Sequence, residues 1–562
     1  MLKKSDRVLP AVIITGCLVG ATAATYWVLT QQNRLTEMPV GANIVPQEAL
    51  LTISVSTDEN QWQQLRQFGT VQTQAELEKN FRQWRDRLLT AYGYNYQRDI
   101  QPWIGKEATI AFLPPEINTN TTTNPAPTNQ NQALLMVLPI ADQAAAQQVW
   151  ESKSQTQNKW ISRNYKGTQI QETPGTGNTN YSAAVLDQRF IVVSDNSQAT
   201  EKAIDTYQNG LSLAKVPGYI TAISKIAQPN RFAQVYLNVP IAARVAQANP
   251  AQTAIPQSLA RLKENQGLAS TITIESEGLR FRSISWLNPN SQRLHRVENS
   301  AGQMQQRLPS ETFMMLSGGN LQQLWQDYVT SSQSNPLAPF PPENLRAGFK
   351  SLTGLDLDRD LLGWMNSEFS LAIVPASTQA QQDFMLSLVL MIETRDRAAA
   401  NKSFQQLEQV LQSRYQFKTQ ETQLGNNTVT NWIAPFGTLT ATRGWLDNNV
   451  AFITLGAPIV ERLLPQPTKN LASTTQFQNT VPKLNPNNGQ FFLDINPTVK
   501  ALPLPQLIPG QNILLEATRS IGGTAAVSDE RSIRYDIFVS LEKEKSQSQS
   551  SENRENILTT SH

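Results

Sequence analysis

Cysteine and histidine are scarce in this sequence. Its 562 residues include one cysteine and two histidines. One cysteine cannot form a disulfide within the chain, and the shortage of both residue types excludes a cysteine-rich zinc site and a cysteine–histidine nucleophile pair in a folded body. We therefore expect a protein that is not an enzyme, with no cofactor and with no catalytic, cofactor-binding or metal-binding residues.

Charge is scarce as well. Only 16% of the residues are charged, against about 25% in an average globular protein, and the formal net charge is +2. Binding to nucleic acid needs a clustered basic excess, so no nucleic-acid partner is expected. The hydrophobic fraction of 40% is sufficient for a core, and the length favours two to four structural units.

The longest apolar run lies near the N-terminus, at residues 8–29. It follows Lys3, Lys4 and Arg7, and its length is close to the ~20 apolar residues that span a bilayer. By the positive-inside rule, this basic flank predicts a cytoplasmic stub and one transmembrane helix within residues 1–33. The body is then extracytoplasmic, in the periplasm or the thylakoid lumen, and the membrane is an expected partner.

Two other interpretations of this segment stay open. A basic start followed by an apolar stretch also describes a cleaved secretory signal peptide. The residues from Ile14 to Cys17 resemble a bacterial lipobox, in which Cys17 would be lipidated after cleavage. The apolar run continues well beyond Cys17 to Leu29, which favours an uncleaved anchor. All three interpretations place the body outside the cytoplasm.

The chain contains two similar segments. Residues 92–114 align without a gap with residues 353–375. A repeat of this kind predicts a body built from similar units. The identical pairs are Gly93/Gly354, Arg98/Arg359, Asp99/Asp360, Trp103/Trp364, Glu107/Glu368, Ala111/Ala372 and Pro114/Pro375.

Further correspondences follow in the same order along the chain, so we expect an internal duplication of the whole body. We call residues 34–290 the first half, residues 291–307 the linker and residues 308–544 the second half. Residues 545–562 are polar and of low complexity, and we expect a disordered tail there. The matched residues include Pro46/Pro309, Ser54/Ser317, Trp62/Trp325, Asp142/Asp396, Leu186/Leu446, Gln234/Gln490 and Leu279/Ile533.

Each half mixes strand and helix patterns without strict alternation. Runs such as LLTISVS and EATIAFLP have the period and the β-branched content of strands, whereas residues 74–91 carry apolar side chains at helical spacing. Asp142, Asn196 and Asp396 are well placed as helix N-caps. Short turns between consecutive strands imply antiparallel pairing. We predict an α+β body in which each half is a mostly antiparallel sheet with packed helices.

The matched segments RDIQPWIG and RDLLGWM resemble the acidic Leu-Pro-Trp-Leu-Gly stretch of the domain of unknown function 3352 family. The resemblance covers essentially the whole chain after the expected anchor. It implies a membrane-anchored protein with one large extracytoplasmic body, best represented in cyanobacteria, and it carries no assigned activity. The second segment departs from the pattern, because Gly363 and Asn366 stand where the first has Pro102 and Gly105.

One acidic motif has the spacing of a calcium loop. Asp356, Asp358 and Asp360 match the first three ligand positions of such a loop. An EF-hand also needs Gly at its sixth position and Glu at its twelfth, where this chain has Leu361 and Ser367. A capped turn before a short helix is the favoured interpretation.

The adjacent pairs Arg98–Asp99 and Arg359–Asp360 suggest acid–base chemistry. However, adjacent side chains point apart in a strand and do not face each other on a helix. Capping of a turn, or a salt bridge to another element, is therefore favoured for both pairs.

Three other candidates have structural alternatives. Trp103 and Trp364 could line a ligand site, but their apolar neighbours favour the core. Residues 174–180 are glycine-rich, yet they lack the third glycine and the Lys-Ser/Thr of a phosphate loop, so a hairpin loop is favoured. A Ser-His-Asp triad could use only His295 in the linker or His562 in the tail, which argues against a serine hydrolase of that design.

Two functional hypotheses follow. The first is a non-enzymatic interaction or scaffold protein of a bacterial envelope or thylakoid membrane. The second is a carrier or binding protein for a lipid or another hydrophobic small molecule, held in a groove between the halves and lined by Trp84, Tyr236 and Phe492. A large apolar cavity would favour the second hypothesis, and a continuous close-packed core would argue against it.

Overall fold

The computed structural model describes most of the body of the chain. Most of the expected anchor and all of the expected tail lie outside the described ranges, as does Trp84. The described residues are 28–30, 38–76, 78–79, 94–114, 132–156, 161–173, 181–248, 264–296, 300–332, 341–376, 385–437, 439–483, 486–501 and 517–543.

Strands and helices both occur along the described part of the first half. The strands are β1 (Val28–Thr30), β2 (Leu51–Ser56), β3 (Glu107–Leu113), β4 (Ala133–Pro139), β5 (Ile161–Tyr165), β6 (Thr168–Glu172), β7 (Ser182–Leu186), β8 (Phe190–Ser194), β9 (Ala233–Asn238), β10 (Asn265–Glu275) and β11 (Gly278–Leu287). The helices are α2 (Glu59–Leu65), η2 (Tyr96–Ile100), α4 (Gln143–Thr156), α5 (Ser197–Asn209), η3 (Leu213–Lys215), α6 (Tyr219–Lys225) and α7 (Val239–Ala248).

The linker and the second half continue in the same way. The strands are β12 (Met314–Gly318), β13 (Phe369–Pro375), β14 (Leu386–Glu393), β15 (Lys418–Leu424), β16 (Asn427–Ile433), β17 (Leu439–Trp445), β18 (Val450–Gly456), β19 (Gly489–Asp494), β20 (Thr518–Asp529) and β21 (Ser532–Leu541). The helices are η5 (Met304–Gln306), α8 (Leu321–Ser332), α9 (Pro342–Thr353), η6 (Leu357–Leu361), η7 (Leu362–Trp364), α10 (Arg397–Tyr415), η8 (Val460–Arg462), η9 (Leu471–Ser473), α11 (Thr475–Thr480) and α12 (Ile495–Ala501).

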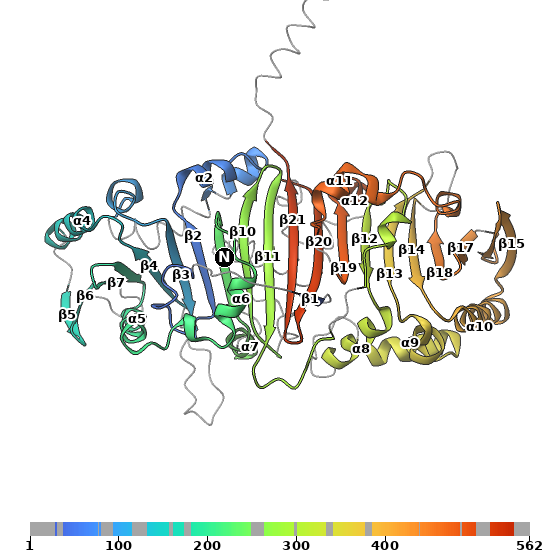
Figure 1. Ribbon diagram of the computed structural model, residues 1–562, viewed down its shortest axis with the longest axis horizontal. Helices are drawn as coiled ribbons and strands as arrows, with labels where there is room; N and C mark the ends of the chain where they lie inside the picture. The colour runs from blue at the N-terminus through green and yellow to red at the C-terminus, as the bar shows by residue number, and fades with distance from the viewer. Residues whose placement is uncertain are drawn as a thin grey trace, which may run out of the picture.

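All described strands belong to one sheet, and its two central strands are β11 and β21 (Figure 1). Every pairing is antiparallel except that of β1 with β20. Outward from the centre, the first half runs β11, β10, β9, β2, β3, β4, β8, β7, β6, β5. The second half runs β21, β20, β19, β12, β13, β14, β18, β17, β16, β15, which is the same topology. The α+β class and the antiparallel pairing predicted from the sequence are confirmed.

One hydrophobic core extends over both halves on one face of the sheet. It includes Leu51 and Val235 from the first half, Phe369 and Phe404 from the second, and Ile537 on the central strand β21. Helices α7 and α10 contribute to it. On the opposite face, α5 and α6 pack on the first half and α11 packs on the second.

Short polar side chains cap the N-termini of three helices at the positions that the sequence predicts. The Asn196 side chain accepts from the Gln198 amide, the Asp142 carboxylate from Ala145 and the Asp396 carboxylate from Ala399, at 2.8–3.0 Å. Each bond satisfies an N–H group that a helix start leaves without an intrahelical partner. The three predicted N-caps are confirmed.

The N-terminal segment is described only in part. Val28–Thr30 form β1, so positions 28 and 29, at the end of the expected membrane span, lie in a strand and not in a helix. Among the helices that the structure describes, none has the length and apolarity needed to cross a bilayer. Cys17 lies outside the described residues.

Candidate functional site

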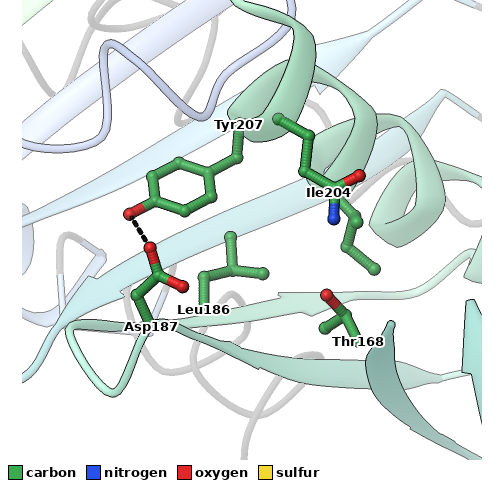
Figure 2. A pocket seen from close by; sticks show the side chains of 6 residues that line it. Thr168, Leu186, Asp187, Ile204 and Tyr207 are labelled. Carbon is green, nitrogen blue, oxygen red and sulfur yellow. Dashed lines mark hydrogen bonds between the residues drawn. The ribbon is translucent and has the colours of Figure 1, made fainter. Parts of the chain in front are cut away.

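A cavity of about 470 Å³ lies beside helix α5 in the outer part of the first half (Figure 2). Strand β6, the turn between β7 and β8, and the last turns of α5 enclose it. The lining residues are Thr168, Leu186, Asp187, Ile204, Tyr207 and Gln208.

Two hairpin turns shape this cavity. Lys166 and Gly167 form the two-residue turn from β5 to β6, with φ of 49° and 85°. The turn from β7 to β8 has three residues, 187–189, and begins with φ of 48° at Asp187 and 54° at Gln188. In both turns, two consecutive left-handed residues match the right-handed twist of the flanking strands. The turn after Leu186 brings the Asp187 carboxylate to the side chain of Tyr207 (Figure 2).

The polar groups of this cavity are hydrogen-bonded to one another. The Tyr207 hydroxyl donates to Asp187 Oδ2 at 2.8 Å, and this bond, together with burial, raises the pKa of Tyr207. Lys166 Nζ lies 2.5 Å from Asp205 Oδ1, and Gln208 Nε2 donates to the Lys166 carbonyl at 3.2 Å. The hydrogen-bonding groups of Asp187, Tyr207 and Gln208 are therefore engaged within the protein itself.

The acidic motif at Asp356 is a capped turn, as the sequence favours. The Asp356 side chain accepts from the Arg359 amide at 2.9 Å, and Asp360 Oδ2 accepts from the Asp356 amide at 2.8 Å. Asp358 instead binds Trp325 and Arg346. The three carboxylates therefore have different partners, and no cluster of metal-ligating side chains occurs in the described ranges.

The matched turn in the first half has the same reciprocal bonds. Asn95 Oδ1 accepts from the Arg98 amide at 3.0 Å, and Asp99 Oδ2 accepts from the Asn95 amide at 2.8 Å. Arg98 Nε also donates to Asp99 Oδ1 at 2.7 Å. The expectation that adjacent Arg and Asp side chains point apart is wrong here, because η2 is a π-helical turn in which the Arg98 guanidinium reaches the neighbouring carboxylate.

The same correction applies to the second adjacent pair. Arg359 Nε donates to Asp360 Oδ1 at 2.9 Å within the π-helical turn η6. This bond and the Asp356 amide lower the pKa of Asp360 to about 2. A carboxylate held in the ionised form in this way is a cap and a poor general acid.

The aromatic residues considered for ligand binding lie in the core. Trp103 and Trp364 are both buried. Tyr236 stacks on Trp286 within the core on one face of the first half, whereas Phe492 packs on Phe477 in the second half. Tyr236 and Phe492 therefore do not line a common groove, and a continuous core joins the halves on the other face.

The remaining sequence candidates carry no reactive arrangement. His295 is buried in the linker, its amide donates to the Glu530 carbonyl at 2.7 Å, and burial lowers the pKa of its imidazole to about 4. His562 and residues 174–180 lie outside the described residues. The strands that flank the glycine-rich segment, β6 and β7, pair antiparallel.

Sequence reasoning missed a polar row that crosses ten strands on one face of the sheet. Its members are direct cross-strand neighbours. Nine of the ten are Ser, Thr, Gln or Asp residues, and the tenth is an arginine. Two of its matched pairs, Ser54/Ser317 and Gln234/Gln490, are visible in the repeat, but only the strand register places them in one line. In order the row is Thr109, Ser54, Gln234, Thr271, Arg282, Asp536, Thr524, Gln490, Ser317 and Ser370.

The fold and these sites define an α+β protein built on one large, mostly antiparallel sheet. Its chain belongs to the family described as protein of unknown function (DUF3352), whose model matches residues 11–541. The family resemblance noted in the sequence is thereby confirmed. No curated protein matches the chain.

Solved structures of TP0453 are similar to part of the chain. Crystal form III is 11% identical with a TM-score of 0.24, and the match covers 46% of this chain and 83% of that one. Crystal form I is 10% identical with a TM-score of 0.25, and it covers 45% and 81%. Scores this low carry no argument about either fold or function.

Proposed function

We propose that this protein is a non-enzymatic, membrane-anchored interaction protein whose body lies outside the cytoplasm. One observation carries the proposal: an apolar surface at the start of β14 and the end of β18 in the second half. We call it the apolar patch. It consists of Met385, Leu388, Phe436 and Leu455, which are 76%, 38%, 96% and 44% exposed.

The register of the strands places two members of this patch side by side. Leu388 and Leu455 are direct cross-strand partners. Met385 immediately precedes β14, and Phe436 lies in the turn that leads into β17, whose Ala441 pairs with Leu455. Contiguous exposed apolar surface is typical of protein–protein contact, whereas single exposed apolar side chains are ordinary.

The first half shows that the fold does not require an apolar pair at this place. The matched positions hold Leu134 of β4 and Asp195, the residue directly after β8, one step beyond the pair of Leu135 with Ser194. Leu134 is buried, and Asp195 Oδ1 accepts from its amide at 2.8 Å. The second half therefore exposes two leucines where the first has one buried leucine and a hydrogen-bonded carboxylate, which supports a role for this surface in binding a protein partner.

We further infer that the two halves arose by internal duplication and that the part of the apolar run before β1, residues 8–27, anchors the body. The duplication is supported by the common strand order and by the matched residues along both halves. The anchor is supported by the length of the apolar run and by its basic flank.

Photo-crosslinking tests the partner. A benzoyl-phenylalanine in place of Leu455, in the full chain in its native membrane, is expected to give one discrete adduct with a defined protein. The control places the same probe at Ile161 on β5, which is 52% exposed in the first half. L388Q is expected to reduce the adduct at position 455 several-fold. Equal yields from positions 455 and 161, or no adduct at 455, would contradict the proposal.

Topology is tested separately by thiol labelling. Because Cys17 is the one cysteine of the chain, the C17S background permits a single new thiol, as in L455C. A membrane-impermeant maleimide is expected to label this thiol from the periplasmic or lumenal side. Labelling from the cytoplasmic side would overturn the extracytoplasmic location without affecting the crosslinking result.

A further inference from the structure

Three arginines and one aspartate meet on one face at the centre of the sheet. Arg282 of β11 is the direct cross-strand partner of Asp536 of β21. Arg280 and Arg534 lie two residues from these partners on their own strands, and residues two apart in a strand share a face. The four side chains are therefore neighbours at the junction of the two halves.

Arg280 occupies both oxygens of the aspartate. Its Nε lies 2.8 Å from Asp536 Oδ1 and its NH2 lies 3.0 Å from Oδ2, which is a bidentate ion pair. Arg280 also lies 3.4 Å from Glu275 Oε1. This guanidinium is thus paired with two carboxylates.

The other two guanidinium groups lack such partners. Arg282 Nε is 3.7 Å from Asp536 Oδ2, and Arg534 has no carboxylate oxygen within 4.0 Å in the part of the chain that the structure describes. Burial lowers the pKa of Arg534, the charge of Asp536 opposes this shift, and the charge of Arg282 adds to it. Beside them, Thr524 is opposite Asp536 and 2% exposed, and its hydroxyl has no hydrogen-bond partner among the described residues.

The two halves differ in the partners of their equivalent arginines. The match of Leu279 with Ile533 makes Arg280 and Arg534 equivalent, and it makes Arg282 equivalent to Asp536. Across the β11–β21 pair, Arg534 is therefore diagonal to an arginine, whereas Arg280 is diagonal to an aspartate. The register of β20 places Asp529 where β10 has Glu275, but the Asp529 carboxylate binds Lys225 and Ser532. In the second half, Arg534 therefore makes neither of the ion pairs that Arg280 makes.

We propose that Arg282 and Arg534, together with the Thr524 hydroxyl, bind a phosphate-type oxyanion at the junction of the halves. Two guanidinium groups can each present a planar fork of N–H donors to the oxygens of such an anion. The nearby carboxylate does not oppose binding strongly, because Arg280 neutralises it. Both arginines are partly exposed, so an anion can reach them. The inference is independent of the apolar patch.

Binding of two probes to the full chain in neutral detergent tests the site by calorimetry. Inorganic phosphate represents the free anion, and dihexanoyl phosphatidylglycerol represents an anionic lipid headgroup, with dihexanoyl phosphatidylcholine as the zwitterionic comparison. Saturable binding of either anionic probe is expected, weakened at least tenfold by R534Q and by R282Q. Binding of phosphate identifies a free anion, and binding of the anionic lipid alone identifies a headgroup.

The control removes a charge elsewhere. R359Q lowers the net charge by the same amount at an exposed turn, and it is expected to leave binding unchanged. Because Arg534 has no carboxylate partner, R534Q is expected to unfold at the temperature of the parent, which separates lost binding from lost folding. Equal binding by R534Q, R282Q and R359Q, or no saturable binding of either anionic probe, overturns the proposal.

Discussion

Trp103 of the first half and Trp364 of the second hold equivalent positions but differ in their hydrogen bonding. The Trp103 indole donates to the Asp99 carbonyl at 2.6 Å. In the second half, the matched carbonyl of Asp360 accepts instead from the Ser403 hydroxyl, and Trp364 Nε1 has no partner among the described residues. Equivalent burial in a common topology therefore does not imply equivalent polar contacts, and variants can measure how far the two halves differ in stability.

The largest difference is expected at the matched glutamates. Glu107 is buried and paired with Arg231 NH2 at 2.7 Å, whereas Glu368 accepts from three backbone amides, those of residues 302–304. R231M removes the ion-pair partner of the buried Glu107 and leaves it the Val40 amide, which donates to Oε1 at 2.9 Å. We therefore expect the free energy of unfolding to fall by about 3–5 kcal/mol in chemical denaturation.

Glu368 offers no side-chain donor whose removal would have this effect, since its partners are main-chain groups. R359M removes an exposed arginine of the second half and serves as the control, with an expected change within about 0.5 kcal/mol. A loss in R231M no larger than in R359M would show that the Glu107 pair does not stabilise the first half.

Acid is expected to weaken the contact between the linker and the second half. His295 faces Arg293, Asp529 and Arg531, and its pKa falls from 6.5 to about 4 on burial. Between these values the unfolded chain binds more protons than the folded chain, so stability is present above pH 6.5 and is lost as the pH falls toward 4. The loss is about 3 kcal/mol in denaturation curves at the two pH values.

H295Q is the matched variant for this titration. It is expected to flatten the pH dependence between 6.5 and 4, because the one other histidine, His562, lies in the C-terminal tail. An unchanged slope in H295Q would mean that other groups cause the acid sensitivity.

A smaller difference is expected between the two equivalent arginines at the centre of the sheet. R280M removes the bidentate partner of Asp536 and should lower the free energy of unfolding by about 2 kcal/mol. R534M removes an unpaired charge next to Arg282 and should leave stability unchanged or slightly raised at low salt. Equal losses in the two variants would indicate that Arg534 has a stabilising partner.

The smallest effect concerns the tryptophans. W103F and W364F remove similar apolar volume, but only W103F breaks a hydrogen bond and leaves the Asp99 carbonyl without that donor. We expect W103F to cost about 1 kcal/mol more than W364F in thermal or chemical unfolding. A larger loss in W364F would show that its indole N–H is satisfied in solution.

Local features of the fold could be predicted from the sequence, because short-range patterns determine them. The N-caps at Asn196 and Asp396 and the turn at Asp187 follow from residue types at fixed offsets. The capped turn at Asp356 was likewise favoured over a calcium loop because two required ligand-loop positions are wrong. The repeat alignment paired residues such as Ser54 and Ser317, which the structure places in one polar row.

Long-range features could not be predicted. The pairing of β11 with β21 joins strands about 250 residues apart, and no local pattern specifies it. The ion pair within Arg98–Asp99 could not be predicted, because it forms in a π-helical turn and ideal strand or helix geometry does not bring adjacent side chains together. The apolar patch was missed because Leu388 and Leu455 are ordinary strand residues until their exposure is known.

The central pairing of β11 with β21 also affects how the protein avoids aggregation. A sheet edge with free N–H and C=O groups can pair with a strand of another chain. Each half on its own would expose such an edge on both sides. Joining the halves leaves β5 and β15 as the outermost strands of the order given above. β15 has the polar sequence KTQETQL, with Lys418 and Glu421 as charged side chains that discourage strand addition. Pairing β11 with β21 therefore removes two sheet edges that separate halves would expose. One of the two remaining outer edges, β15, carries charged side chains.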